Sequence, residues 1–265
     1  MIDRIIAYMR CPRCAGTQLR GQHSFLACRT CNAHYPVADG ILDMMPDEAS
    51  EVITPFQRIM QTPLVVSVYE RIWRRLGYFI ASSRSFDREV DAILRLQRGG
   101  EDARLLDLAC GTGIFTRPLA RATRSLVVGL DLSRPMLRHA RRLADAEGLQ
   151  DIVLVRGTAF RLPFIAEAFA AVNCCGALHL FDQPDLALDE IARVLHRSGQ
   201  LSVQTTIRPQ HSAGTAYFLE RFIRFGFFEE DGLREKLRRH GFKILACERH
   251  RISCTLLARH ISCPD

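Results

Sequence analysis

The sequence predicts an α/β protein whose mostly parallel sheet follows a small metal-binding module. Short apolar runs alternate with helix-like segments from Ala103 onward, which is typical of parallel strands joined by crossover helices. A glycine-rich turn, Gly111-Thr112-Gly113, follows the first of these runs, and two Cys-x-x-Cys pairs precede the alternating region. The 265 residues therefore suffice for one full α/β core with a small appendage beside it.

The alternating region contains seven predicted strands. They cover residues 104–109, 125–130, 151–156, 170–175, 200–206, 242–248 and 253–259. Before this region, residues 11–45 are rich in cysteine, glycine and turn formers, whereas residues 55–96 alternate apolar and basic residues at helical spacing. We therefore expect a zinc-ribbon mini-domain at 1–47, a helical connector or lid at 48–100 and the main α/β domain at 101–265.

Composition and charge restrict the class of protein and its partners. The net charge of +7 comes from arginines spread along the chain, so an anionic partner such as RNA is permitted without being required. Residues 1–10 lack the pattern of a secretory signal, so we expect a cytoplasmic protein. The apolar span 164–181 contains Glu167 and Asn173 and reads as a loop and a buried strand, so we expect no membrane segment.

The two Cys-x-x-Cys pairs predict a zinc site. Cys11 and Cys14 are separated by thirteen residues from Cys28 and Cys31, so the four thiolates can converge on one tetrahedral ion. A redox dithiol is the alternative, but a redox pair normally opens a helix and neither pair here does so. His23 and His34 are also near enough in sequence to replace a cysteine. We expect the four cysteines to hold a structural Zn²⁺, because so small a ribbon has too little apolar surface to fold alone.

The glycine-rich turn predicts a ligand at the end of the first strand. Asp107 lies inside this strand end, where its charge would repel a pyrophosphate but suits a ligand that carries an ammonium and a sulfonium. Asp131, at the end of the next strand, is eighteen residues after Gly113, where a carboxylate can accept both hydroxyls of a ribose. The alternative is that Asp131 caps the following helix, but Ser133 is the better cap and leaves Asp131 free.

Four segments in this order resemble the class I methyltransferases that use S-adenosylmethionine, in particular the type 11 branch that includes ubiquinone and menaquinone biosynthesis enzymes. The segments are residues 107–113, 127–133, 155–164 and 188–199. In addition, residues 35–41 (YPVADGI) are similar to the closing segment of small zinc-ribbon proteins that activate methyltransferases. Residues 62–74 resemble the connector of chloroplast and bacterial methyltransferases that begin with the same cysteine pairs.

The resemblance implies a Rossmann-like, seven-stranded, mostly parallel sheet with helices on both faces. It also implies S-adenosylmethionine as the cofactor and assigns its contacts to Asp107, Ala109, Gly111, Gly113, Asp131, Leu132, Thr158, Ala159, Phe160 and Cys175. The chain departs from the family at Thr158 and Ala170, where aspartate is usual. We therefore expect a weaker adenine contact, in which the Thr158 hydroxyl accepts a hydrogen bond from the adenine amino group.

Methyl transfer from a sulfonium needs an acceptor held in line, and a base only when the acceptor must lose a proton. His179 follows the fourth strand of the domain and is our candidate base. The aromatic stretch 217–228 favours a small apolar or aromatic metabolite as the acceptor, such as a quinone or a natural product. Two alternatives stay open: an RNA methyltransferase that docks RNA on the ribbon, and a non-catalytic partner protein.

Overall fold

A computed structural model describes residues 2–22, 24–45, 62, 66, 75–96, 103–123, 125–209 and 226–261. The ribbon consists of α1 (Asp3–Ile6), β1 (Leu19–Gln22), β2 (Phe25–Cys28), β3 (His34–Ala38) and β4 (Ile41–Asp43). The strands of the main domain are β5 (Arg104–Leu108), β6 (Leu126–Asp131), β7 (Ile152–Arg156), β8 (Phe169–Cys175), β9 (Leu195–Thr206), β10 (Phe242–His250) and β11 (Ser253–His260).

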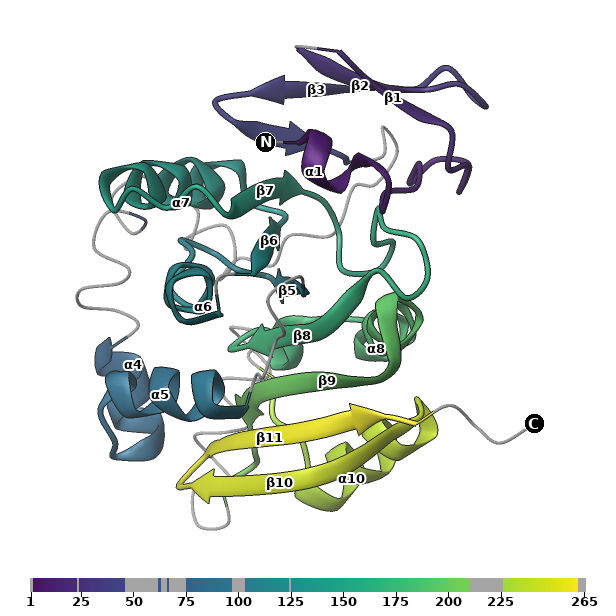
Figure 1. Ribbon diagram of the computed structural model, residues 1–265. Coiled ribbons are helices and arrows are strands. Elements are labelled where there is room, and N and C mark those ends of the chain that lie inside the picture. The colour runs from purple at the N-terminus through teal and green to yellow at the C-terminus, as the bar shows by residue number, and fades with distance from the viewer. Residues whose placement is uncertain are drawn as a thin grey trace.

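The helices lie on both faces of the sheet (Figure 1). One face is covered by the helices that precede or follow the first three strands of the main domain: α4 (Arg75–Ser82), α5 (Phe86–Leu96), α6 (Thr116–Thr123) and α7 (Arg134–Ala146). The 3₁₀ helix η2 (Leu178–Leu180) comes after β8, and α8 (Pro184–Val194) and α10 (Glu230–Arg239) cover the other face. No helix in the described ranges is at once long and apolar enough to cross a bilayer.

The strand order is β1-β2-β3-β4-β7-β6-β5-β8-β9-β11-β10. Strands β5 to β9 pair in parallel. β11 is antiparallel to both of its neighbours, β9 and β10, and a tight turn joins it to β10 as a hairpin. All seven predicted strands are therefore present. The start of β9 at Leu195 is earlier than the predicted residue 200, because α8 ends at Val194 and the chain extends at once.

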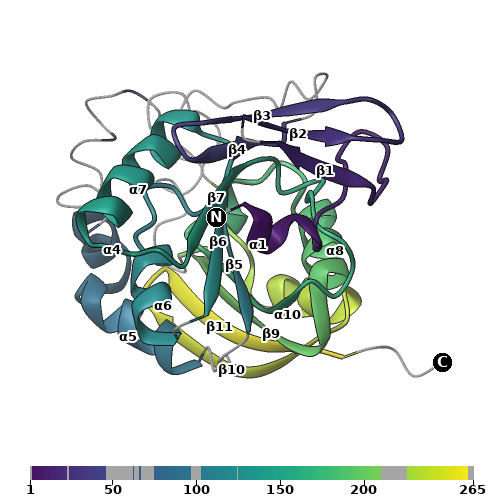
Figure 2. The same ribbon diagram turned by 45° about the horizontal axis from the view of Figure 1, so that its top comes forward.

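The prediction of a seven-stranded sheet undercounts the strands, because the ribbon adds to the edge of the sheet. β4 pairs in parallel with β7, with Ile41 opposite Leu154 and Asp43 opposite Arg156. The ribbon hairpins then continue the sheet beyond β4, as Figure 2 shows. An edge strand leaves its backbone groups unpaired, and β4 satisfies those of β7.

The alternation of side chains along each strand divides the core into two layers. Leu105 of β5 belongs to the layer under α6 and α7, whereas Leu106 belongs to the layer under α8. The ribbon contributes to the second layer through Ile5 and Met9, both fully buried. The ribbon therefore shares its apolar core with the main domain and does not enclose one of its own.

Candidate cofactor site and cysteine cluster

The glycine-rich turn connects the end of β5 to α6 through three residues in the left-handed region. Ala109, Gly111 and Gly113 have φ values of 56°, 56° and 78°. A Cβ on Gly111 would meet nothing within 4 Å, so open space lies beside the turn at this residue. A Cβ on Gly113 would lie 3.3 Å from the Cβ of Ala140, so this glycine lets α7 approach closely. The two glycines therefore serve different purposes, space for a ligand and helix packing.

Asp107 is buried below this turn, with 2% of its surface exposed. The Thr116 hydroxyl donates to one carboxylate oxygen at 2.5 Å, and the Asn173 side-chain amide donates to the other at 2.6 Å. Burial raises the pKa of Asp107 to about 6, against the lowering effect of these two hydrogen bonds. The carboxyl group is thus held in one orientation by two donors.

Asp131 ends β6 beside the same turn and already has structural partners. One carboxylate oxygen accepts from the Gly111 N–H at 2.8 Å, and the other accepts from the Ser133 N–H at 2.8 Å. Ser133 is the N-cap of α7, as expected, and accepts from the Met136 N–H at 3.4 Å. The expectation that this cap leaves Asp131 free is therefore wrong. Since each carboxylate oxygen has two lone pairs, Asp131 keeps acceptor capacity for a ligand.

The residues predicted for the adenine side lie after β7. The Thr158 hydroxyl accepts from the Phe160 N–H at 3.1 Å, so the hydroxyl shapes its own loop. Ala159 is buried, and the half-buried Phe160 ring meets Phe181 edge to face, with centroids 5.7 Å apart. Leu132, another predicted cofactor contact, follows β6; its carbonyl accepts from the Arg156 guanidinium at 3.0 Å, and the residue is half-buried.

Cys175, predicted as a cofactor contact, ends β8, and the candidate base His179 follows this strand. The Cys175 thiol donates to the Asn173 side-chain oxygen at 3.0 Å. His179, on η2, is buried, and its Nδ1 lies 3.3 Å from the Thr205 hydroxyl at the end of β9. The His179 carbonyl accepts from the Gly226 N–H at 3.1 Å, and a Cβ on Gly226 would clash with this oxygen. The imidazole is therefore fixed between the ends of two neighbouring strands.

The predicted cofactor and catalytic residues thus lie at or just beyond the carboxyl ends of β5 to β8, which is where open α/β sheets bind ligands. The Thr112 hydroxyl supports a ligand at this edge: it is fully buried and has no hydrogen-bond partner in the described part of the chain. Together with the space at Gly111, the residues present fit a cofactor that carries hydroxyl and charged groups.

Sequence reasoning missed Thr112, Thr116 and Asn173 as parts of this site. Asn173 carried a usable signal, because a fully buried amide in an apolar strand needs partners. The partner became visible only in the sheet register, which places Asn173 opposite Asp107.

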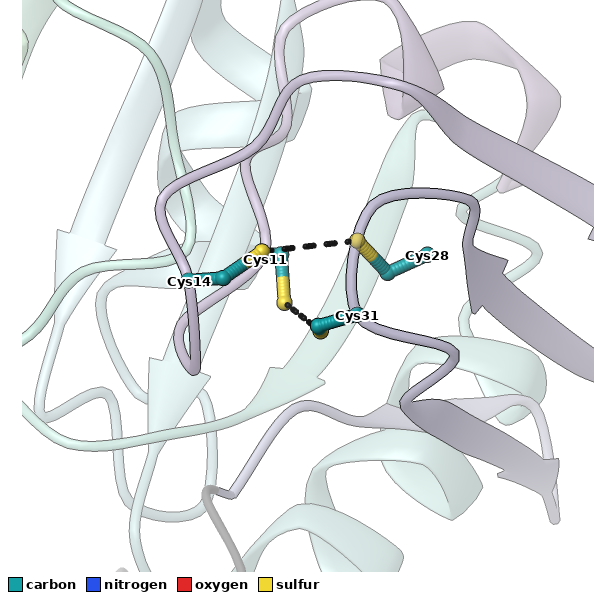
Figure 3. Close-up of side chains that lie close together, drawn as sticks. All are labelled: Cys11, Cys14, Cys28 and Cys31. Carbon is teal, nitrogen blue, oxygen red and sulfur yellow. Dashed lines mark hydrogen bonds between the residues drawn. The ribbon is translucent and has the colours of Figure 1, made fainter.

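The four predicted cysteines converge at the ribbon (Figure 3). Their sulfur atoms all lie within 4.8 Å of one another, and the pairs Cys11–Cys31 and Cys14–Cys28 are each 3.6 Å apart. Zn–S bonds of about 2.3 Å place the sulfurs of a tetrahedral site about 3.8 Å apart, whereas a disulfide requires about 2.0 Å. The residues present therefore fit a tetrahedral Zn²⁺.

Two matching turns build this cluster. The Ala15 N–H donates to the Cys11 carbonyl at 2.8 Å, and the Asn32 N–H donates to the Cys28 carbonyl at 2.9 Å. Ala15 and Asn32 both have positive φ, which turns each chain back after its second cysteine. The Tyr35 hydroxyl lies 3.0 Å from the Cys11 sulfur and can donate to a thiolate there.

The two histidine alternatives have different outcomes. His34 is exposed, stacks on Phe25 at a centroid distance of 5.0 Å and does not belong to the cluster. His23 lies outside the described residues, as do positions 217–225 of the aromatic stretch and most of the connector segment 62–74.

The chain resembles known methyltransferases in sequence. A methyltransferase-domain family model matches residues 105–199. An uncharacterised chloroplastic methyltransferase of Arabidopsis thaliana is 35% identical over 191 residues, which are 68% of this chain and 52% of that protein. A demethylmenaquinone methyltransferase of Thermus thermophilus is 38% identical over 155 residues, 57% of this chain and 68% of that enzyme. The chain spans about half the length of the chloroplast relatives that it matches.

Comparison with solved structures shows that the fold is also that of methyltransferases. Phosphoethanolamine N-methyltransferase 2 of Haemonchus contortus, determined in complex with S-adenosyl-L-methionine, superposes with a TM-score of 0.62. The identity is 19%, and the match covers 74% of this chain and 46% of that one.

Proposed function

This chain belongs to the methyltransferase family, and from that premise we propose that it transfers a methyl group from S-adenosylmethionine to a small apolar or aromatic metabolite. The observation that carries this proposal is that the glycine-rich turn, Asp131 and Asp107 lie together at the carboxyl ends of β5 and β6. Bound S-adenosylmethionine would supply an electrophilic methyl group on a sulfonium.

The residues of the chain would hold this cofactor by charge and by hydrogen bonds. Asp131 would accept the ribose hydroxyls while its hydrogen bond to the Gly111 N–H fixes the turn. Asp107 would supply a negative charge near the cationic end of the cofactor, and the Thr112 hydroxyl would gain the partner that it lacks among the described residues.

On the reaction side, the chain would orient the acceptor and exclude water. His179 lies beyond the carboxyl end of β8 with its ring held by Thr205, so it would remove a proton from an acceptor hydroxyl or acidic carbon. The choice of an apolar or aromatic acceptor is supported by relatives that are named demethylmenaquinone methyltransferases.

We also propose that the four cysteines bind a structural Zn²⁺. A structural site uses all four positions of the tetrahedron for protein ligands, and four sulfurs at mutual distances below 4.8 Å provide them. The ion would contribute to folding and take no part in methyl transfer.

Incubation of the purified protein with methyl-labelled S-adenosylmethionine and an extract of its source cells tests the proposed activity. Label in the organic-extractable fraction supports a metabolite methyltransferase. Label confined to RNA overturns the choice of acceptor and favours docking of RNA on the ribbon, and no transfer above an Asp131→Ala control overturns the enzymatic function.

A further inference from the structure

The ribbon contacts the loop that follows β7, on the adenine side of the candidate cofactor site. The chain at Met9 forms an antiparallel bridge with Phe164. On either side of this bridge, the Arg10 N–H donates to the Pro163 carbonyl at 3.1 Å, and the Ile165 N–H donates to the Tyr8 carbonyl at 2.9 Å. The residues just before the first cysteine turn are therefore hydrogen-bonded directly to the cofactor loop.

The Arg10 side chain strengthens this junction through a carboxylate on α8. Its guanidinium donates to both oxygens of Glu190 at 3.1 and 3.0 Å and to the Leu162 carbonyl at 3.3 Å. Glu190 in turn accepts from the Leu162 N–H at 2.6 Å. The side chains of Arg10 and Glu190 are only 21% and 13% exposed, so water competes weakly with these contacts.

Two further arginines join the same elements. Arg193 donates to the Leu162 carbonyl at 3.2 Å and to the Phe164 carbonyl at 2.7 Å, which fixes the loop to α8. Arg161 donates to the Pro12 carbonyl at 3.3 Å, and Pro12 lies within the turn between Cys11 and Cys14. The loop is thus hydrogen-bonded both to the turn between Cys11 and Cys14 and to residues 8–10, which precede this turn.

We propose that Arg10 and Glu190 are positioning residues that couple the cysteine cluster to the cofactor loop, so that the metal state of the ribbon controls affinity for the cofactor. A metal-loaded cluster holds the Cys11 turn and therefore Arg10 in place. Loss of the metal would release Leu162 and, through it, the residues Thr158 to Phe160 that we predict to contact the adenine. The inference rests on the proposed function, because the affinity in question is that for S-adenosylmethionine.

Coupling between two sites is reciprocal, so the cofactor must also stabilise the metal in the ribbon. We expect removal of the metal to weaken S-adenosylmethionine binding about tenfold, and saturating S-adenosylmethionine to slow transfer of zinc to a chromophoric chelator by a similar factor.

The test compares the metal-loaded and chelator-treated full-length protein. Calorimetry measures affinity for S-adenosylmethionine, and hydrogen exchange of residues 157–166 measures loop protection without cofactor. The variants are Arg10→Gln, Arg10→Lys and Glu190→Gln. The matched control is Arg4→Gln, which breaks another bridge from the ribbon to the main domain, the 2.7 Å pair of Arg4 with Asp151 before β7, where both side chains are about half exposed.

We expect metal removal to speed exchange of the loop and to weaken binding in the wild type and in Arg4→Gln. In Arg10→Gln and Glu190→Gln, the loop should exchange faster with the metal still present, and metal removal should weaken binding less than twofold, with Arg10→Lys intermediate. Unchanged exchange in the metal-free wild type overturns the coupling. Coupled exchange in a protein that never binds S-adenosylmethionine overturns the proposed function instead.

Discussion

Replacement of Asp131 by alanine removes an acceptor that serves both the fold and the proposed ligand. In the protein, the carboxylate accepts the N–H groups of Gly111 and Ser133, both at 2.8 Å. A hydrogen bond to a charged group contributes about 1.5 to 3 kcal/mol, but Asp131 keeps some exposed surface, so water can replace part of each bond. We therefore expect Asp131→Ala to lower the free energy of unfolding by about 1 to 3 kcal/mol.

The effect on binding is separate, because the ribose would lose its charged acceptor. A loss of about 1.5 to 3 kcal/mol corresponds to a dissociation constant for S-adenosylmethionine that rises about tenfold to about 150-fold. Calorimetry measures the dissociation constant, and denaturant unfolding measures stability. Asp131→Asn keeps one side-chain oxygen as an acceptor and should lie between the wild type and Asp131→Ala.

Ser133→Ala is the matched control. It removes the N-cap of α7 and should lower stability by about 0.5 to 2 kcal/mol while leaving Asp131 and the affinity unchanged. A folded Asp131→Ala protein with wild-type affinity would refute the assignment of the ribose to this carboxylate. Equal loss of affinity in Ser133→Ala would show that Asp131 acts only by shaping the turn.

Three further predictions concern the other groups of the two sites. Burial raises the pKa of Asp107 to about 6, so its charge is lost below this pH and affinity for the cationic cofactor should fall between pH 7 and 5. Burial also raises the pKa of Asp131, so calorimetry should show a smaller dependence, and not its complete loss, in Asp107→Asn. Burial alone would raise the pKa of Glu190, but the hydrogen bond and charge of Arg193 outweigh burial and lower this pKa. The contribution of the ionised Glu190 to stability is therefore present at neutral pH and is lost as the pH falls below the usual range of glutamate. Acid unfolding should show a smaller loss of stability in Glu190→Gln than in the wild type, and an unchanged profile would contradict this. His179→Gln should lower the rate of label transfer about 100-fold or more with S-adenosylmethionine affinity unchanged, whereas a wild-type rate would exclude His179 as the base.

Removal of the metal tests the cysteine cluster. Cys14→Ser should abolish stoichiometric zinc by metal analysis and unfold the two cysteine turns while β5 to β9 remain folded, because structural zinc contributes about 10 to 16 kcal/mol to small domains of this kind. Zinc-free wild-type protein with an intact ribbon would contradict the structural role.

The sequence alone determined the fold class and the family, and it predicted many residues of both candidate sites, because each depends on local spacing. The strand-turn-helix pattern at Asp107 to Gly113 and the two cysteine pairs have their meaning within a few residues, and the family resemblance that they carried is confirmed by the methyltransferase relatives. The same local rules predicted Ser133 as the cap of α7.

Only the tertiary structure decided which residues from distant parts of the chain meet. The pairing of β4 with β7 joins the ribbon to the sheet, although Leu42 and Val155 are far apart in sequence. The hydrogen bond of Asp131 to Gly111 and the contact of Arg10 with Glu190 depend on strand register and on how α8 packs. Such contacts leave no periodic signal in the sequence, because each involves one charged side chain and not a repeating pattern. Their geometry depends on how the whole sheet is assembled.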